Sequence, residues 1–424
     1  MGGRLMDMPW DDPALITSFD EEIEALVTFA GQSRARIGFG SLLADGRIDL
    51  GQPIELWITA RMTYVFSLAE LLGIGGAREL VDHGLKALSG PFRDEVNGGW
   101  YSAIVPYSDD EAAPVPKARK EAYAHAFVVL AASAAAQAGH DGARNLLHDA
   151  LNDQEEHWWD PSWGRVRDSA NVDFSRYSTY RGMNANMHTV EAYLAAWETT
   201  GDRVWLDRAR AILRWISELN SRGGGRLVEH FDDKWLPTPE LNADRPADPF
   251  RPYGVTPGHA FECSRLLLAA HAALENIGEK PGAWMSQAAK DLYERASKDG
   301  WAEDGVAGFV YTTDYDGRPV LRLRMHWVAC EAICAALAMG RHELADGNSE
   351  QALSCAHDFA TWLSWADEYL HDAPGHWIHE LAEEGGRSTV IWPGRPDAYH
   401  VIQMLLMART RPGVGFAASL VRCP

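Results

Sequence analysis

Hydrophobic positions recur with helical spacing in six segments of this 424-residue chain. In each segment a polar or aromatic start is followed by a run rich in alanine and leucine, with apolar residues three and four positions apart. The segments are residues 57–73, 119–139, 184–201, 256–274, 325–340 and 395–408. They recur about every 68 residues, which is too long for a helical hairpin of the TPR or HEAT type. Each repeat must therefore hold a second helix and a sizeable loop.

A more highly charged amphipathic stretch precedes each of the six segments. These stretches cover residues 18–32, 77–88, 143–157, 202–220, 284–298 and 350–369. Between the two kinds of helix, glycine and tryptophan-rich runs predict short β-hairpins at residues 94–104, 158–166, 303–317 and 371–381. Six helix pairs without a solubilising cap at either end predict an all-α closed ring, an (α/α)6 barrel. No linker interrupts the pattern, so we expect one domain over residues 1–424.

Composition limits the kinds of partner and the cellular compartment that we expect for this protein. Sixty acidic residues against 39 basic ones give a net charge of -21, which repels phosphate backbones and anionic lipids, so we expect no nucleic-acid partner. No apolar run reaches membrane-spanning length, so we expect no membrane association. Five cysteines without a CxxC pair, and an N-terminus without the apolar region of a signal peptide, predict a reducing, cytoplasmic location. The sequence leaves the oligomeric state open, a homo-oligomer included.

Polar side chains gather in the first turns of the six apolar helices, which in a ring meet at one rim of a central cavity. Trp57 and Arg61 are one turn apart, and Asn184, His188 and Glu191 share the face of another helix. The remaining members are His259 with Glu262, Trp327 with Glu331, and Tyr399 with His400 and Gln403. Each uncompensated buried polar group costs about 1–3 kcal/mol, so we expect these groups to be used. Histidines, carboxylates, an arginine and aromatic walls predict binding of a polyol and proton transfer on it.

Structural roles remain alternatives for several of these residues. A single histidine on an apolar helix is usually structural, and we interpret His125, His271 and His326 in this way. Glu191 is either a structural partner for an arginine between helices or a member of the site, and the sequence does not decide between the two. Arg61 could also serve only to neutralise a neighbouring carboxylate.

Metal binding is a further alternative. His188 with Glu191, and His259 with Glu262, form two His-x-x-Glu pairs. Di-metal helical bundles use the opposite order, Glu-x-x-His, together with two more glutamates on neighbouring helices. Neither feature is evident here, so we expect no metal and no other cofactor.

Four motifs together resemble the N-acylglucosamine 2-epimerase superfamily. They are RGMNANMHTVEAYLAAWETTGD, TPGHAFECSRLLL, MHWVACEAICAAL and WPGRPDAYHVIQ, and the similarity spans nearly the whole chain. Within the superfamily the chain is most similar to the aldose-ketose isomerase branch, which contains mannose and sulfoquinovose isomerases. The resemblance implies an (α/α)6 barrel that interconverts free monosaccharides without a metal.

By motif position, the resemblance also implies roles for individual residues. His259 and His400 would be the acid/base pair, with Glu262 supporting His259. The residues implied to hold the sugar are Arg61, Tyr123, Asn184, His188 and Glu331, to which the residue pattern adds Trp57 and Trp327 as aromatic walls. Two positions depart from related patterns. Pro396 stands where sulfoquinovose isomerases carry glutamine, which favours mannose, and Cys263 replaces a common tryptophan.

These residues suit the interconversion of mannose and fructose. That reaction needs ring opening, removal of the C2 proton to give an enediol, and return of a proton to C1, and a neutral imidazole can act as the base. We assign this role to His400, which has no acidic residue one turn further along its helix, and assign ring opening to His259 beside Glu262. The alternatives are a sulfoquinovose isomerase or sugar 2-epimerase, a glycoside hydrolase with two flanking carboxylates, and a non-catalytic sugar-binding protein.

Overall fold

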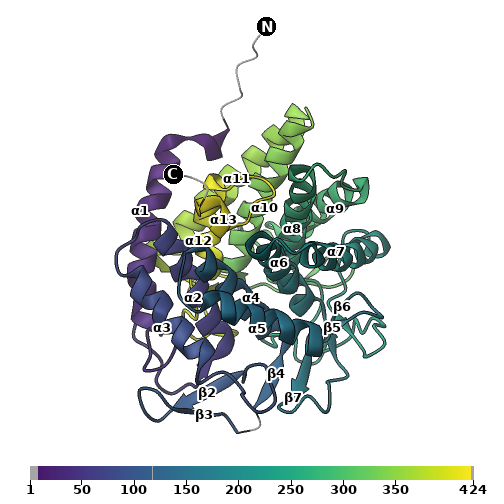
Figure 1. The fold of residues 1–424 in the computed structure, drawn as a ribbon. Helices are drawn as coiled ribbons and strands as arrows, with labels where there is room; N and C mark the ends of the chain where they lie inside the picture. Colours follow the sequence, from purple (N-terminus) through teal and green to yellow (C-terminus); the bar gives the residue numbers. More distant parts are fainter. Residues whose placement is uncertain (1–7, 117, 422–424) are drawn as a thin grey trace.

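The computed structural model describes residues 8–116 and 118–421, and its helices form the predicted (α/α)6 ring (Figure 1). The inner helices are α2 (Leu56–Leu71), α4 (Ala122–Gln137), α6 (Met183–Thr200), α8 (Pro257–Asn276), α10 (His326–Ala345) and α12 (Tyr399–Leu406). The outer helices are α1 (Pro13–Ala30), α3 (Ala77–Ser89), α5 (Ala143–Asp153), α7 (Arg203–Gly223), α9 (Ala283–Gly300) and α11 (Ser349–Tyr369). Each inner helix contacts the next one, and α12 contacts α2, so the ring is closed.

The two kinds of helix differ in composition because they differ in burial. Nearly every side chain of α2 and α4 is buried, and the many alanines of α4 allow its neighbours to approach closely. Helix α7 is amphipathic instead, with a buried apolar face that includes Trp205 and Ile212. The Asp202 side chain caps its start by accepting a hydrogen bond from the Val204 N–H at 3.0 Å, and Gly224 follows its last residue with a φ of 59°.

Short antiparallel strands occupy the connections between helices. They are β1 (Ile54–Glu55), β2 (Ala103–Pro106), β3 (Ala112–Pro114), β4 (Arg119–Glu121), β5 (Trp159–Asp160), β6 (Arg165–Val166), β7 (Ser169–Asn171), β8 (Arg181–Gly182), β9 (His230–Phe231), β10 (Thr312–Thr313), β11 (Pro319–Leu321), β12 (Arg324–Met325), β13 (His371–Ala373), β14 (His376–Trp377) and β15 (Glu380–Leu381). The predicted hairpins at 158–166 and 371–381 are confirmed as β5–β6 and β13–β14.

The other two hairpin predictions need correction. Residues 303–317 contain β10, but its partner β11 begins only at Pro319, so the hairpin lies further along the chain. Residues 94–104 form no hairpin. The turn through Gly98 and Gly99, both at positive φ, gives only a single bridge between Arg93 and Trp100. Strand β2 begins at the end of this segment and pairs with β1 and β3.

Several of these strands tie the start of an inner helix to the loop that follows the next outer helix. Strand β8 pairs with β9, and β12 pairs with β15. At these junctions the backbone N–H of Met183 donates to the carbonyl oxygen of Glu229 at 2.9 Å, and that of His326 donates to His379 at 3.1 Å. Glu229 and His379 therefore occupy equivalent places in the repeat, beside the first turns of α6 and α10.

The two ends of the ring are covered differently. Figure 1 shows strands β2, β3, β4 and β7 below the helices, and the C-terminal helix α13 (Phe416–Val421) near the opposite end. Helix α13 contacts α2, α4 and α6. The last inner helix is shorter than the predicted segment 395–408, because the chain from Arg395 to Ala398 is not yet helical.

The described residues also bear on membrane insertion and on the cysteines. Across residues 8–116 and 118–421, no helix combines the length and apolar character needed to cross a bilayer. Cys263, Cys330, Cys334 and Cys355 are buried free thiols. Cys423 lies outside the described residues.

Candidate active site

Nine of the ten side chains predicted to form the site line one pocket at the first turns of the inner helices. They are Trp57, Arg61, Tyr123, Asn184, His188, His259, Glu262, Trp327 and His400. The tenth, Glu331, is fully buried behind the wall of the pocket and contacts His400. The pocket is also lined by Pro249, Phe250, Pro252, Tyr311, His326, His379, Trp392, Pro396 and Asp397. Of these, the sequence pointed only to Pro396, as a position that favours mannose, and to His326, as a structural histidine.

Buried polar atoms without a hydrogen-bond partner are concentrated on this pocket. Within the described part of the chain they include Trp57 Nε1, Arg61 Nε, Asn184 Oδ1, His188 Nδ1, His326 Nε2 and both carboxylate oxygens of Glu262. Most buried polar groups in proteins are paired, so such a group of unpaired donors and acceptors calls for a ligand. A polyol meets this requirement because each hydroxyl both donates and accepts.

His400 is held by a carboxylate from the neighbouring inner helix. Its Nδ1 lies 2.9 Å from Oε1 of Glu331, which leaves Nε2 as the other nitrogen available for chemistry. Burial lowers the pKa of His400, although the hydrogen bond to Glu331 works in the opposite direction. The pocket therefore favours a neutral imidazole, which is the form that can accept a proton.

Glu331 differs from its predicted role. The resemblance implied that it holds the sugar, but its two oxygens face His400 and the Arg265 guanidinium, whose Nε is 3.1 Å away. Burial would raise the pKa of Glu331, but Arg265 and His400 lower it, so the carboxylate is ionised. No acidic residue follows His400 one turn along its own helix, as the sequence indicates, but Glu331 reaches it from α10.

His259 is held by a residue that the sequence analysis missed. Its Nδ1 lies 2.8 Å from Oε2 of Glu229, and Oε1 of the same carboxylate accepts the backbone N–H of Thr256 at 2.8 Å. Burial would raise the pKa of Glu229, but His259 lowers it, so an ionised carboxylate faces the imidazole. The prediction that Glu262 supports His259 is therefore corrected: residues three apart share a helix face, but a loop residue supplies the contact.

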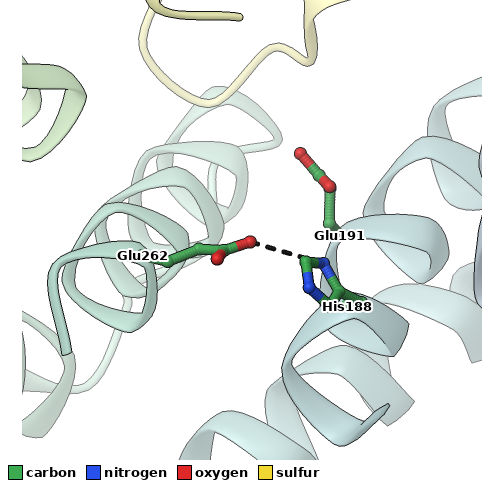
Figure 2. A group of neighbouring side chains, drawn as sticks. All are labelled: His188, Glu191 and Glu262. Atoms are coloured by element: carbon green, nitrogen blue, oxygen red, sulfur yellow. Dashed lines mark ion pairs between the residues drawn. The ribbon is translucent and has the colours of Figure 1, made fainter. Parts of the chain in front are cut away.

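Glu262 extends from α8 toward α6 instead. Its Oε1 lies 3.4 Å from Nδ1 of His188, and Figure 2 shows this pair with the carboxylate of Glu191 directed away from it. Burial raises the pKa of Glu262 well above its usual value, and the negative charge of Glu331 adds to the effect. Burial thus favours the protonated form of Glu262, and in that form the carboxyl group can donate a hydrogen bond into the pocket that it lines.

The same three side chains are the one group among the described residues whose spacing could hold a metal ion. One ligand atom from each of His188, Glu191 and Glu262 lies within 4.8 Å of the other two. The Arg265 guanidinium, however, is 3.8 Å from Glu191 and 3.9 Å from Glu262. A fixed positive charge beside two of the three ligands opposes a second cation there.

The contacts of Glu191 distinguish between its two alternative roles. Its carboxylate accepts hydrogen bonds from the hydroxyl of Tyr399 and, at 3.0 Å, from Nε2 of Gln403, and it lies near Arg265. It does not line the pocket that contains the histidines. Glu191 is thus a structural partner between the inner helices, and Tyr399 and Gln403 lie in this buried network.

Arg61 neutralises a carboxylate and also lines the pocket. One guanidinium nitrogen forms an ion pair with Asp397 at 3.0 Å, and another donates to the Tyr123 hydroxyl at 3.0 Å. Its remaining nitrogen, Nε, is buried without a partner among the described residues, and the side chain lines the pocket. The neutralised carboxylate is therefore part of the site, since Asp397 lines the pocket too.

The residues that the sequence analysis missed come mostly from loops, where no helical periodicity marks them. Glu229 and His379 stand at equivalent junctions of the repeat, so aligning the short strands after the outer helices could have found both. Asp397 is two residues before the first residue of α12, and its Oδ1 accepts the Tyr399 N–H at 2.9 Å, so it resembles a helix-capping residue in sequence.

Comparison with known proteins identifies the family to which this chain belongs. Residues 38–404 match the family model described as N-acylglucosamine 2-epimerase. A D-mannose isomerase of Thermobifida fusca is 43% identical over 392 residues, which cover 91% of each chain. A D-mannose isomerase of Pseudomonas cannabina pv. alisalensis is 41% identical over 387 residues, covering 91% of this chain and 90% of that one.

Solved structures agree on the fold. A crystal structure of D-mannose isomerase superposes with a TM-score of 0.82 at 23% identity, covering 94% of this chain and 99% of the other. The chain belongs to the N-acylglucosamine 2-epimerase family. It is an enzyme of the isomerase class, as the resemblance of its four motifs predicted.

Proposed function

We propose that this isomerase interconverts D-mannose and D-fructose without a metal, by histidine acid/base catalysis through an enediol. The observation that carries the proposal is the pocket itself, where two histidines, each held by a buried carboxylate, meet a group of unpartnered polar atoms. The D-mannose isomerases that are 41% and 43% identical to this chain support the choice of sugar.

In this proposal His400 is the carbon base. Its neutral imidazole removes the C2 proton of open-chain mannose, and the electron pair forms the C1–C2 double bond of the enediol. The imidazolium then returns a proton to C1 on the same face, and O2 becomes the carbonyl oxygen of fructose. Glu331, ionised beside Arg265, stabilises the imidazolium that exists between the two transfers.

His259 transfers protons to and from the oxygen atoms of the sugar. Paired with the ionised Glu229, it can protonate the ring oxygen when the pyranose opens, and it can take part in the transfer of a proton between O2 and O1. Arg61 lines the pocket with an unpartnered Nε–H that can donate to a sugar oxygen, and the unpartnered Oδ1 of Asn184 can accept a hydrogen bond from a sugar hydroxyl. A correctly placed donor at a developing oxyanion contributes about 3–4 kcal/mol to catalysis.

The product formed first distinguishes this proposal from its alternatives. The purified protein is incubated separately with mannose, glucose, N-acetylmannosamine and sulfoquinovose, and the products are followed by NMR. We expect fructose to be the dominant early product from mannose. Early glucose from mannose would indicate a 2-epimerase, turnover of sulfoquinovose alone would indicate the sulfonated sugar as substrate, and recovery of every sugar unchanged would indicate a binding protein.

A further inference from the structure

His326, which the sequence analysis interpreted as structural, is the first residue of α10 and lines the pocket. Only 6% of its surface is exposed, and its ring centre lies 6.4 Å from that of His400. The His379 ring stacks on it at 3.8 Å with an angle of 20° between the planes. The imidazole is therefore held in a fixed plane in the wall beside the proposed base.

The contacts of His326 fix which nitrogen carries its proton. Its Nδ1 lies 3.3 Å from the carbonyl oxygen of His379, the same oxygen that accepts the backbone N–H of His326 at 3.1 Å. A carbonyl oxygen only accepts, so Nδ1 carries the hydrogen and Nε2 of the neutral ring is an acceptor. Burial lowers the pKa of His326 to about 3, so the ring is neutral near pH 7.

His125 shows how a structural histidine in this fold differs. It lies in the first turns of α4 and is 1% exposed. Its Nδ1 is 2.8 Å from the carbonyl oxygen of Glu121, and its Nε2 accepts the backbone N–H of Trp100 at 3.0 Å. Both nitrogens of His125 are thus satisfied by the protein. Nε2 of His326 is buried and has no partner within the described residues.

We propose that His326 is a specificity-determining residue whose Nε2 accepts a hydrogen bond from a sugar hydroxyl on a carbon beyond C2. This assignment rests on the proposed function, because it takes C2 of the sugar to face His400. The 6.4 Å between the two ring centres then places the group facing His326 further along the carbon chain. A hydroxyl can donate to this acceptor, whereas an ionised sulfonate can only accept, so a sulfonate at the position that faces His326 is disfavoured.

Deoxy sugars test the assignment. The kcat/KM values for D-mannose and its 3-deoxy, 4-deoxy and 6-deoxy analogues are measured for the wild type and for His326→Phe, His326→Gln and His326→Asn. We expect the wild type to disfavour one analogue by about tenfold, the loss of one hydrogen bond. His326→Phe and His326→Asn should each show the same kcat/KM for that analogue and for mannose. His326→Gln should restore part of the preference, because its amide oxygen reaches the position of Nε2.

Each preference is the ratio of kcat/KM for mannose to kcat/KM for the analogue, measured on one protein sample. A smaller folded fraction lowers both values equally and leaves the ratio unchanged. His125→Phe is the matched control: it removes an equally buried histidine and should lower the melting temperature while keeping the wild-type ratio. Identical ratios in the wild type and all His326 variants would overturn the assignment. Failure of the wild type to form fructose from mannose would instead contradict the proposed function, and it is seen before any ratio is taken.

Discussion

Each histidine assigned to proton transfer is oriented by a carboxylate from another segment, Glu331 for His400 and Glu229 for His259. In both pairs the imidazole lowers the pKa of its carboxylate partner, so each histidine faces an ionised carboxylate. Burial lowers the pKa of His400 despite its carboxylate, which favours the neutral imidazole that the proposed carbon base requires.

Glu229→Gln tests the partner of His259. The substitution keeps the shape but replaces a charge-assisted hydrogen bond by a neutral one, a change of about 1.5–3 kcal/mol. We expect kcat/KM for mannose to fall by about 10- to 100-fold, with a smaller effect when an open-chain substrate is supplied. Asp233→Asn, at an exposed position four residues away, is the control and should leave the rate unchanged. Wild-type activity in Glu229→Gln would show that His259 does not depend on this carboxylate.

At the scale of single residues, the sequence predicted the first-turn side chains but not their pairing. His188, His259 and His400 all lie within the first two turns of inner helices, and the helical repeat places these turns at one pocket. Glu229 and Asp397 belong to connections without periodicity, and Glu331 points along the wall rather than into the pocket. Contacts between helices depend on packing, which a pattern along one chain does not contain.

Arg265 links three inner helices beneath the pocket. Its guanidinium lies 3.1 Å from Glu331 on α10, 3.8 Å from Glu191 on α6 and 3.9 Å from Glu262 on its own helix α8. Burial, together with the negative charge of Glu331, raises the pKa of Glu262, whereas Arg265 and His400 lower the pKa of Glu331 despite its burial. Arg265 therefore stabilises the charged form of Glu331.

Arg265→Met should therefore destabilise the ring strongly. Removing one partner of a buried ion pair leaves uncompensated charge and costs about 3–5 kcal/mol. We expect a loss of this size in the free energy of unfolding, measured by urea denaturation at pH 7. Arg318→Met is the matched control, since this arginine is 75% exposed and its ion pair with Asp316 should contribute less than about 1 kcal/mol. Equal losses in the two variants would contradict a central role for Arg265.

At the scale of elements, the sequence predicted helices better than connections. All six helix pairs appear near their predicted ranges because apolar spacing extends over several turns in each. The strands are two to four residues long, and their partners are set by the helices that they join. For this reason residues 94–104 form no hairpin, and β2, which begins at Ala103, pairs with β1 and β3 instead.

The whole molecule brings the first turns of its inner helices to one pocket, and that geometry follows from closing the ring. Contact between α12 and α2 joins residues more than three hundred positions apart, as in the ion pair of Arg61 and Asp397. Six helix pairs without a capping segment at either end predicted this closure. The repeat does not predict the choice of sugar, because the pocket is also lined by loop residues such as Trp392 and Phe250, which carry no helical periodicity.

Metal independence is a prediction for the whole enzyme. The group of His188, Glu191 and Glu262 has the spacing of a metal site, but Arg265 supplies positive charge beside it. We expect mannose turnover to be unchanged after dialysis against EDTA, measured beside a sample dialysed against buffer alone. Loss of activity that Mn²⁺ or Co²⁺ restores would show that the group holds a metal in the working enzyme.

Deuterium exchange in His400→Asn tests the central claim most directly. The wild type and the variant are incubated with D-mannose in D2O, and NMR follows deuterium at C2 of mannose and C1 of fructose. The account predicts exchange and turnover in the wild type and the loss of both in His400→Asn, while the melting temperature confirms that the variant is folded. Exchange in the variant at a rate within about tenfold of the wild type, a difference of only about 1.4 kcal/mol in barrier, would contradict the claim that His400 is the base.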